Sequence, residues 1–231
     1  MNVLGVIPAR GGSKGIPKKN LRVLNGLSLV GRAAKVAMET AEITKTVVSS
    51  DCPVIIREAS RFGVEAPFVR PFELSGDTIG DQPVLEHALT ESEKYYECIF
   101  DYIIMIQPTA PLRTVDHLRQ ALSYCIENQY ESVWTVSSLN PSYHPDKVLS
   151  LENGFLSYYS ANGGNVVARQ QLSELFYRNG LAYVISRSLL LNKKNLMSRN
   201  TGALLIPGNF VSIDVEADLT TVEQLLKKDY L

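Results

Sequence analysis

The chain has 231 residues, of which 45% are hydrophobic and 20% charged, a composition typical of a folded globular protein. A net charge of −1 together with this apolar content excludes an intrinsically disordered chain. No stretch approaches the roughly 18 apolar residues of a membrane helix, and the start of the chain shows no secretory signal. We therefore expect a cytoplasmic protein without a membrane partner.

The charge is distributed unevenly along the chain. Residues 1–38 contain seven Lys or Arg and no acidic residue, whereas the remaining 193 contain 16 basic and 24 acidic residues, a net charge of −8. A basic segment on an acidic protein favours a small polyanion as the ligand. A nucleic-acid-binding domain is more often basic throughout, so we expect no nucleic acid partner.

Apolar runs and amphipathic segments alternate through most of the chain. We expect strands at residues 3–7, 46–50, 65–69, 102–106, 132–136, 181–185 and 210–213. We expect helices at residues 28–38, 53–62, 81–95 and 114–126, and a last helix that contains residues 219–226. Asp51 and Thr114 are placed to cap the second and fourth of these helices. The alternation predicts an α/β fold with a mostly parallel sheet and helices on both faces.

Residues 139–177 interrupt this pattern. The segment is polar and aperiodic, and we interpret it as an arm inserted into a single domain that spans residues 1–231. Its aromatic residues, such as Tyr143, Phe155 and Tyr159, would bury little surface on one monomer. A symmetric homodimer is the arrangement expected to cover them.

A glycine-rich, basic segment follows the first expected strand, at residues 8–20 with the sequence PARGGSKGIPKKN. Loops at the carboxyl ends of parallel strands are where open α/β sheets bind ligands. Adjacent glycines let backbone N–H groups approach phosphate oxygens, and basic side chains can neutralise them; here these are Arg10, Lys14, Lys18 and Lys19. The spacing is neither that of a Walker loop nor GxGxxG. We predict a phosphate-binding loop, with a solvated basic turn as the alternative.

The segment QPTAPLR at residues 107–113 follows the most apolar expected strand. Its two prolines stiffen the loop, and Gln107 lies at the strand end, where a ligand contact is expected. The alternative is a rigid crossover loop without a binding role.

Two acidic residues, Asp214 and Glu216, alternate at the end of the last expected strand. Alternate residues of a strand point to the same face, and two carboxylates on one face can hold Mg²⁺. Opposite a basic loop, such an ion would bridge to a polyphosphate. The alternatives are solvated acids or a cap of the last helix.

Together these segments resemble the acylneuraminate cytidylyltransferase family, the CMP-sialic acid synthetases. The first motif matches the family signature closely over residues 7–20, and the resemblance spans nearly the whole chain. Further matches follow in the family's order: VSSD at 48–51, RPFELSGDT at 70–78, QPTAPLR at 107–113, HPDK at 144–147, RQQ at 169–171, RNG at 178–180 with Tyr183, and SID at 212–214.

The resemblance implies a Rossmann-like nucleotide-diphospho-sugar transferase fold. It also implies a reaction in which CTP and a nonulosonic sugar acid give a CMP-sugar and pyrophosphate, with Mg²⁺ as cofactor. The arm at 139–177 would form a homodimer interface and reach the neighbour's active site. The product would enter lipopolysaccharide or capsule biosynthesis.

The family's site residues can be carried over by position, as implications of the resemblance. The nucleotide and its phosphates would be bound by Arg10, Gly11, Gly12, Ser13, Lys14, Lys19, Asn20 and Arg70. The sugar site would contain Gln107, Lys147, Arg169 and Tyr183. Catalysis would depend on Arg10, Lys19, Arg169 and Asp214, with Asp214 and Glu216 as metal ligands.

The sequence departs from the family's pattern at two positions, and two alternative functions stay open. Glu216 replaces the second Asp of the family's Asp-x-Asp, so either Glu216 or Asp218 would complete the metal site, and Asp81 stands where many members have Ser or Thr. One alternative is a synthetase for CMP-3-deoxy-manno-octulosonate, which contains an eight-carbon acid, although residues 169–171 and 178–180 favour the nine-carbon branch. The other alternative is an inactive nucleotide-binding homologue. The nonulosonic acid itself (neuraminate, legionaminate, pseudaminate or another) and the general base are not assigned.

Overall fold

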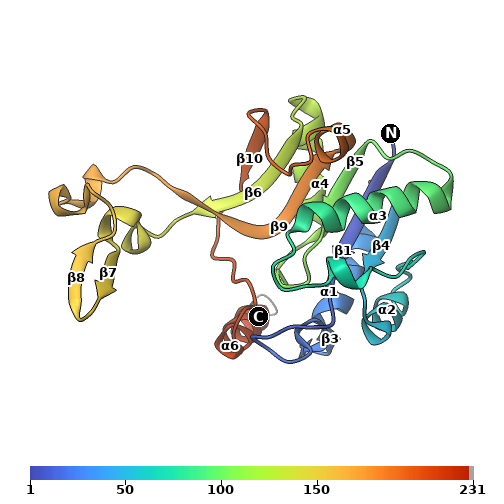
Figure 1. The fold of residues 1–231 in the computed structure, drawn as a ribbon, viewed down its shortest axis with the longest axis horizontal. Coiled ribbons are helices and arrows are strands. Elements are labelled where there is room, and N and C mark those ends of the chain that lie inside the picture. The colour runs from blue at the N-terminus through green and yellow to red at the C-terminus, as the bar shows by residue number, and fades with distance from the viewer. Residues whose placement is uncertain (229–231) are drawn as a thin grey trace.

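The computed structural model describes residues 1–228, whose centre is a six-stranded sheet in the order β10-β6-β9-β5-β1-β4 (Figure 1). The strands are β1 (Val3–Pro8), β4 (Lys45–Ser49), β5 (Tyr102–Met105), β6 (Ser132–Ser138), β9 (Phe176–Ser186) and β10 (Thr201–Leu205). Strand β1 is parallel to β4 and β5, β10 is parallel to β6, and β9 is antiparallel to both of its neighbours. The predicted mostly parallel sheet is therefore confirmed.

Helices cover both faces of this sheet, as predicted. They are α1 (Leu29–Glu39), α2 (Pro53–Ser60), α3 (Asp81–Tyr96), α4 (Val115–Glu127), α5 (Arg187–Asn192) and α6 (Glu216–Lys228). Along β1, Val3 and Ile7 pack in a core with α1, α2 and α4, whereas Leu4 and Val6 pack in a second core with α3 and α5. The alternation of side chains along a strand thus gives the sheet two buried faces.

Shorter elements complete the chain. Two hairpins pair β2 (Val23–Leu24) with β3 (Leu27–Ser28) and β7 (Leu149–Glu152) with β8 (Phe155–Tyr158). Short 3-10 turns lie at Lys19–Leu21, Phe72–Leu74, Pro141–Tyr143, Pro145–Lys147, Gly163–Asn165 and Arg169–Gln171.

Two local expectations early in the chain are wrong, and one cap is confirmed. No strand forms at residues 65–69, where Glu65 makes only an isolated bridge to Val47. Cys52, not Asp51, is at the N-cap of α2, and the Asp51 carboxylate accepts the backbone N–H of Gly11. Thr114 caps α4 as expected, accepting the N–H of His117 at 3.4 Å.

The expected strand at residues 210–213 is also wrong. This segment is extended without ladder pairing, and Ile213 is buried in a small cluster with Ile16, Leu24 and residues of α6. Its apolar character comes from this packing rather than from a place in the sheet. The sixth strand is β10, which the sequence analysis missed together with α5.

The arm projects from the body of the molecule (Figure 1). It leaves the sheet after β6 and returns at β9, which begins at Phe176, so it spans residues 139–175 and ends two residues earlier than expected. The β7-β8 hairpin at its tip exposes large apolar side chains, among them Phe155 at 80% and Leu156 at 68% of their surface.

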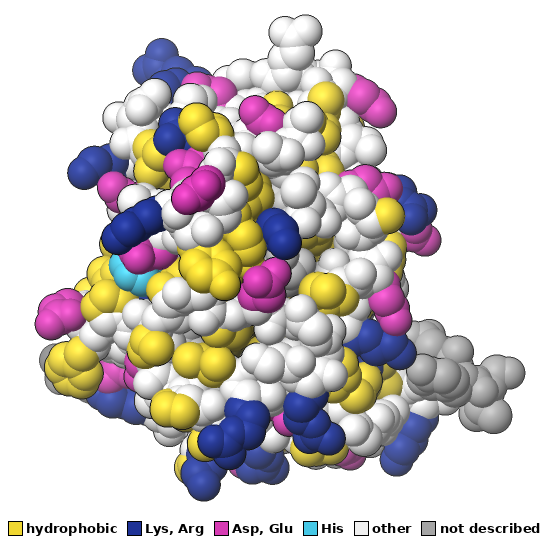
Figure 2. Space-filling model, turned by 90° about the vertical axis from the view of Figure 1, so that its right-hand side faces the viewer, with side chains coloured by type: hydrophobic (Ala, Val, Ile, Leu, Met, Phe, Trp, Pro, Cys, Tyr) yellow, Lys and Arg dark blue, Asp and Glu magenta, His cyan; other side chains and the backbone are white. Residues whose placement is uncertain are grey.

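Figure 2 shows the face turned away from the arm, on which acidic, basic and apolar side chains are interspersed. Within residues 1–228, no helix combines the length and the apolarity that crossing a bilayer requires.

Candidate active site

A cavity of about 460 Å³ opens where the chain leaves the carboxyl ends of β1 and β5. Three segments and one carboxylate line it: the predicted phosphate-binding loop, the stretch that leads into α3, the residues after β5, and Asp214. Its lining comprises Pro8, Arg10, Ser13, Lys14, Gly15, Lys19, Asn20, Arg70, Leu74, Gly76, Asp77, Ile79, Asp81, Val84, Gln107, Pro108, Thr109 and Asp214. The two loops that the sequence singled out therefore meet at one cavity.

Close packing holds the phosphate-binding loop in place. The N–H of Gly11 donates to Asp51 Oδ1 at 2.8 Å, and a Cβ on Gly11 would lie 2.9 Å from the Cβ of Cys52. A Cβ on Gly15 would lie 2.8 Å from the carbonyl oxygen of Asp214. Asn20 is buried, and its amide donates to the carbonyl of Arg10 at 2.9 Å. The loop is fixed to its surroundings at several points rather than being a free solvated turn.

One carboxylate neutralises two of the loop's cations. Arg10 Nη1 donates to Asp77 Oδ1, and Lys14 Nζ pairs with Asp77 Oδ2. The hydrogen bonds from Lys14 and then Arg10 lower the pKa of the Asp77 carboxyl. The side chains predicted to bind phosphate are thus already arranged around an anionic group.

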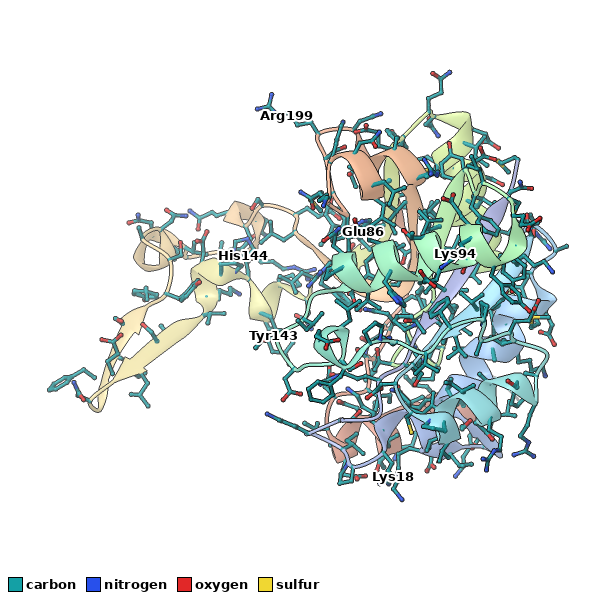
Figure 3. The ribbon with its side chains drawn as sticks, turned by 45° about the vertical axis from the view of Figure 1, so that its right-hand side comes forward. Lys18, Glu86, Lys94, Tyr143, His144 and Arg199 are labelled. Atoms are coloured by element: carbon teal, nitrogen blue, oxygen red, sulfur yellow. The ribbon has the colours of Figure 1, made fainter. Side chains whose placement is uncertain are left out.

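The third cation, Lys19, joins the loop to the segment before α6. Its ammonium donates to the carbonyl of Ile213 at 2.8 Å and to Asp214 Oδ1 at 3.0 Å. Lys18 is exposed and does not line the cavity, and its side chain points away from the body of the molecule (Figure 3). Adjacent lysines therefore have different environments.

The expectation that Asp214 and Glu216 share one face is wrong, because the strand that it required does not form. Glu216 is the first residue of α6, and both of its oxygens accept from Arg22, at 2.8 and 2.9 Å. Asp218 Oδ2 accepts the N–H groups of Asp214 and Val215 at 2.7 and 2.8 Å. Asp218 therefore holds the two residues that precede α6, and of these three acids only Asp214 lines the cavity.

Three carboxylates line the cavity: Asp77, Asp81 and Asp214. Within the described residues, no three His, Cys, Asp or Glu side chains gather in an arrangement that could hold a metal. Mg²⁺ is commonly bound through one or two carboxylates, with substrate phosphates and water as its other ligands. Asp214 pairs with Lys19 but lines the cavity, so it fits that limited role. Glu216 pairs with Arg22 and does not line the cavity.

Opposite the loop, a second group of polar side chains lines the cavity. Gln107 Nε2 donates to Asp81 Oδ2 at 3.1 Å. Burial raises the pKa of the Asp81 carboxyl, against the opposing effect of Arg178 and Arg70. The Arg70 guanidinium is itself buried, which lowers its pKa to about 10, and it donates to the carbonyl and the hydroxyl of Ser49.

A buried arginine connects Gln107 to strand β9. Arg113 donates to the carbonyls of Gln107 and Gly180, each at 2.8 Å, and also to that of Leu181. Gly180 has a φ of 75°, and the register between β6 and β9 shifts there. Asn179 holds this bulge through hydrogen bonds with Thr135 and Ser137. The sequence analysis gave no role to Arg113, although it ends the quoted QPTAPLR motif.

Several predicted site residues lie elsewhere. Gly11 and Gly12 belong to the loop but do not line the cavity. Tyr183 is buried beside Trp134, with ring centroids 5.1 Å apart, and likewise does not line it. Lys147 and Arg169 are exposed on the arm, and neither side chain makes a hydrogen bond or ion pair with the described residues. One chain therefore does not bring all the predicted sugar-binding residues together.

Arg169 instead lines a separate cavity of about 1150 Å³ at the base of the arm, together with Tyr143 and His144. Figure 3 shows these last two residues where the arm leaves the body. His144 is buried there, and its Nδ1 accepts the N–H of Asp146 at 3.1 Å.

A mostly parallel sheet with a glycine-rich, cation-bearing loop at its carboxyl edge is the arrangement of nucleotide-binding α/β proteins. The family model described as cytidylyltransferase matches residues 4–223. The chain belongs to this family of nucleotidyltransferases, as the sequence resemblance indicated.

Similar proteins match over nearly the whole chain. The chain is 30% identical to Post-translational flagellin modification protein B of Campylobacter coli, across 99% of this chain and 97% of the relative. It is 28% identical to the pseudaminic acid cytidylyltransferase of Campylobacter jejuni, across 100% of this chain and 98% of the relative. The solved structure of CMP:2-keto-3-deoxy-manno-octonic acid synthetase complexed with CTP has a TM-score of 0.74, covering 99% of this chain and 100% of that chain. Its sequence identity is 17%, so this likeness concerns the fold.

Proposed function

We propose that this protein activates a nonulosonic, sialic-acid-like sugar acid with CTP, giving a CMP-sugar and pyrophosphate. The observation that carries the proposal is the cavity at the sheet edge, where Arg10, Lys14 and Lys19 face neutral and acidic groups after β5 and before α3. Such a cavity suits a ligand with a polyanionic part and an uncharged polar part. The family membership and the relative named pseudaminic acid cytidylyltransferase support CTP and a sugar acid as these ligands.

The cations of the loop would perform most of the catalysis. The anomeric hydroxyl attacks the α-phosphorus, the bond to the β-phosphate oxygen breaks, and pyrophosphate leaves. Arg10, Lys14 and Lys19 would neutralise the charge that accumulates on the leaving group and hold the phosphates in line. For this, phosphate oxygens replace the carboxylate of Asp77 at Arg10 and Lys14.

Magnesium is part of the proposal, with Asp214 as the carboxylate that would hold it. When bound, the ion supplies further charge neutralisation on the phosphates. The attacking hydroxyl loses its proton to solvent or to Asp214 through water. No histidine is among the described residues that line the cavity.

The arm supports a proposed homodimer. Lys147 and Arg169 lie on an arm that projects from the body (Figure 1), and Arg169 lines a different cavity from Gln107. A two-stranded hairpin alone is only marginally stable in water, yet β7 and β8 expose Leu151, Phe155 and Leu156. A second copy of the chain would cover these side chains and receive the arm's cations at its own cavity.

We also propose a cytoplasmic location and a role in supplying a surface glycan such as lipopolysaccharide or capsule. The chemical basis is that a CMP-linked sugar acid is an activated donor for glycosyl transfer.

The direct test is pyrophosphate release from CTP with a panel of sugar acids: N-acetylneuraminate, legionaminate, pseudaminate and 3-deoxy-manno-octulosonate. Mass spectrometry of each reaction identifies the CMP-sugar. We expect turnover with at least one nine-carbon acid. Turnover only with the eight-carbon acid would establish the alternative synthetase, and no turnover with any acid would leave a nucleotide-binding homologue.

The two neighbouring lysines provide a matched pair of variants. Lys19→Ala removes a cation that lines the cavity, so we expect kcat/KM for CTP to fall by the equivalent of about 2–4 kcal/mol. Lys18→Ala removes an exposed cation that does not line it, and we expect nearly wild-type kinetics. Equal kinetics for the two folded variants would show that Lys19 does not act on the nucleotide.

Variants of Asp214 and Asp218 distinguish metal binding from a structural role at the start of α6. If Asp214 holds Mg²⁺, Asp214→Asn should lower kcat by about 100-fold or more, the equivalent of about 2.7 kcal/mol, with little change in Tm. Asp218→Asn weakens the hydrogen bonds to the N–H groups of Asp214 and Val215, so we expect a lower Tm and a smaller kinetic loss. A fully active, Mg²⁺-dependent Asp214→Asn enzyme would place the metal elsewhere.

The dimer proposal predicts a solution mass of twice the 25.6 kDa of one chain, measured by light scattering at micromolar concentration. Phe155→Glu puts a charge on the exposed tip of the arm, so we expect dissociation and loss of activity with the fold retained. Ile99→Glu, on a side chain that is 62% exposed away from the arm, is the control and should stay dimeric. A fully active monomer would contradict the proposal.

A further inference from the structure

Asp81 and Gln107 meet inside the cavity although they come from different elements. Asp81 is the first residue of α3, and Gln107 follows β5. Their side chains are joined by the 3.1 Å hydrogen bond from Gln107 Nε2 to Asp81 Oδ2. Both residues line the cavity, so this bond lies next to the ligand space rather than in the core.

The chemistry of the pair fixes the orientation of the Gln107 amide. An ionised carboxylate only accepts hydrogen bonds, so the NH₂ group of Gln107 must face Asp81. The carbonyl oxygen Oε1 then points toward β9, where a Cβ on Gly180 would lie 3.8 Å from it. A residue that can both donate and accept at position 81 would leave both amide orientations available.

The backbone of Gln107 is held independently of its side chain. Arg113 binds the carbonyl of Gln107 and, with the same Nη2, the carbonyl of Gly180. The distance between Gln107 and the bulge of β9 is therefore set by the scaffold. The scaffold leaves the orientation of the side-chain amide free, and Asp81 fixes that orientation.

Charge indicates which part of a ligand approaches this pair. Arg10, Lys14 and Lys19 mark the phosphate end of the cavity, and the Asp81 carboxylate repels phosphate. Gln107 Oε1 faces Gly180 of β9, two residues after Arg178, whose guanidinium lies over the Trp134 ring, 5.5 Å from its centroid. A third cavity, of about 450 Å³, is lined by Trp134, Phe176, Arg178 and Met197 among others.

We propose that Asp81 is a positioning residue that turns Gln107 so that its carbonyl oxygen accepts a hydrogen bond from the sugar acid. The donor is a hydroxyl or an N-acyl N–H group on the sugar. The proposal rests on the proposed function, because that function supplies the sugar acid. A donor on the nucleotide is the competing source, and the kinetics of the two substrates distinguish them.

The first test replaces Asp81 by Asn, which can both donate and accept. With the panel acid that the wild type uses best, we expect KM for the sugar acid to rise about tenfold, the scale of one lost hydrogen bond. KM for CTP and Tm should stay near the wild-type values. Glu86→Gln removes another carboxylate of α3 that does not line the cavity, and it should leave both KM values unchanged.

The second test is a double-mutant cycle. Gln107→Glu sets two carboxylates against each other, so we expect kcat/KM for the sugar acid to fall by about 100-fold or more. Adding Asp81→Asn places a hydrogen-bond donor opposite the carboxylate introduced at position 107 and should recover about tenfold of that loss. Strictly additive effects, an unchanged sugar KM in Asp81→Asn, or an effect on KM for CTP instead would overturn the proposal.

A third measurement needs no turnover. The side-chain NH₂ resonance of Gln107, assigned by its loss in Gln107→Leu, should shift between the wild type and Asp81→Asn in the ligand-free protein. An unchanged resonance would show that Asp81 and Gln107 are not hydrogen-bonded, and the proposal would fail. If the resonance shifts as expected but the wild type makes no CMP-sugar, the proposed function fails and the orienting contact stands.

Discussion

Positive charge concentrated at one edge of a sheet has to be neutralised by anions from elsewhere. The first 38 residues carry no acid at all, so the carboxylates that pair with the cations at positions 10–22 come from distant segments. Asp77 pairs with Arg10 and Lys14, Asp214 with Lys19, and Glu216 with Arg22. Each exposed pair contributes little stability. Their common effect is to join the loop, the approach to α3 and the start of α6 around one cavity.

This neutralisation also prepares the site for a polyanion. A carboxylate between Arg10 and Lys14 keeps the two cations close together, so the ligand does not have to assemble them. In the proposed reaction, phosphate oxygens would take the place of the carboxylate oxygens at these two cations. On the opposite wall, Arg113 fixes the backbone through three carbonyls and no carboxylate. The cavity thus has one wall held by ion pairs and one wall held by hydrogen bonds to backbone carbonyls.

The strength of the local signal decides what the sequence could predict. The strands at residues 3–7 and 102–106 are nearly continuous apolar runs, and the loop after the first one had to lie at a carboxyl edge, so both strands and the site's position were predictable. The strand predicted at 210–213 is wrong because Ile213 is buried by α6 and Ile16 rather than by a neighbouring strand. The partnership of Asp77 with Arg10 joins residues 67 positions apart, and no local pattern encodes it.

The arm divides the proposed site between two kinds of structure. The cavity that carries the loop's cations is built on the sheet and belongs to one chain, whereas Lys147 and Arg169 are carried by a segment whose hairpin buries little of itself. A chain's own fold therefore preorganises the nucleotide half of the proposed site. In the proposed homodimer, the arm's cations would reach a sugar carboxylate at the neighbour's cavity. If the arm serves a second copy in this way, dimer formation completes the sugar half of the site and leaves the nucleotide half as the sheet already holds it.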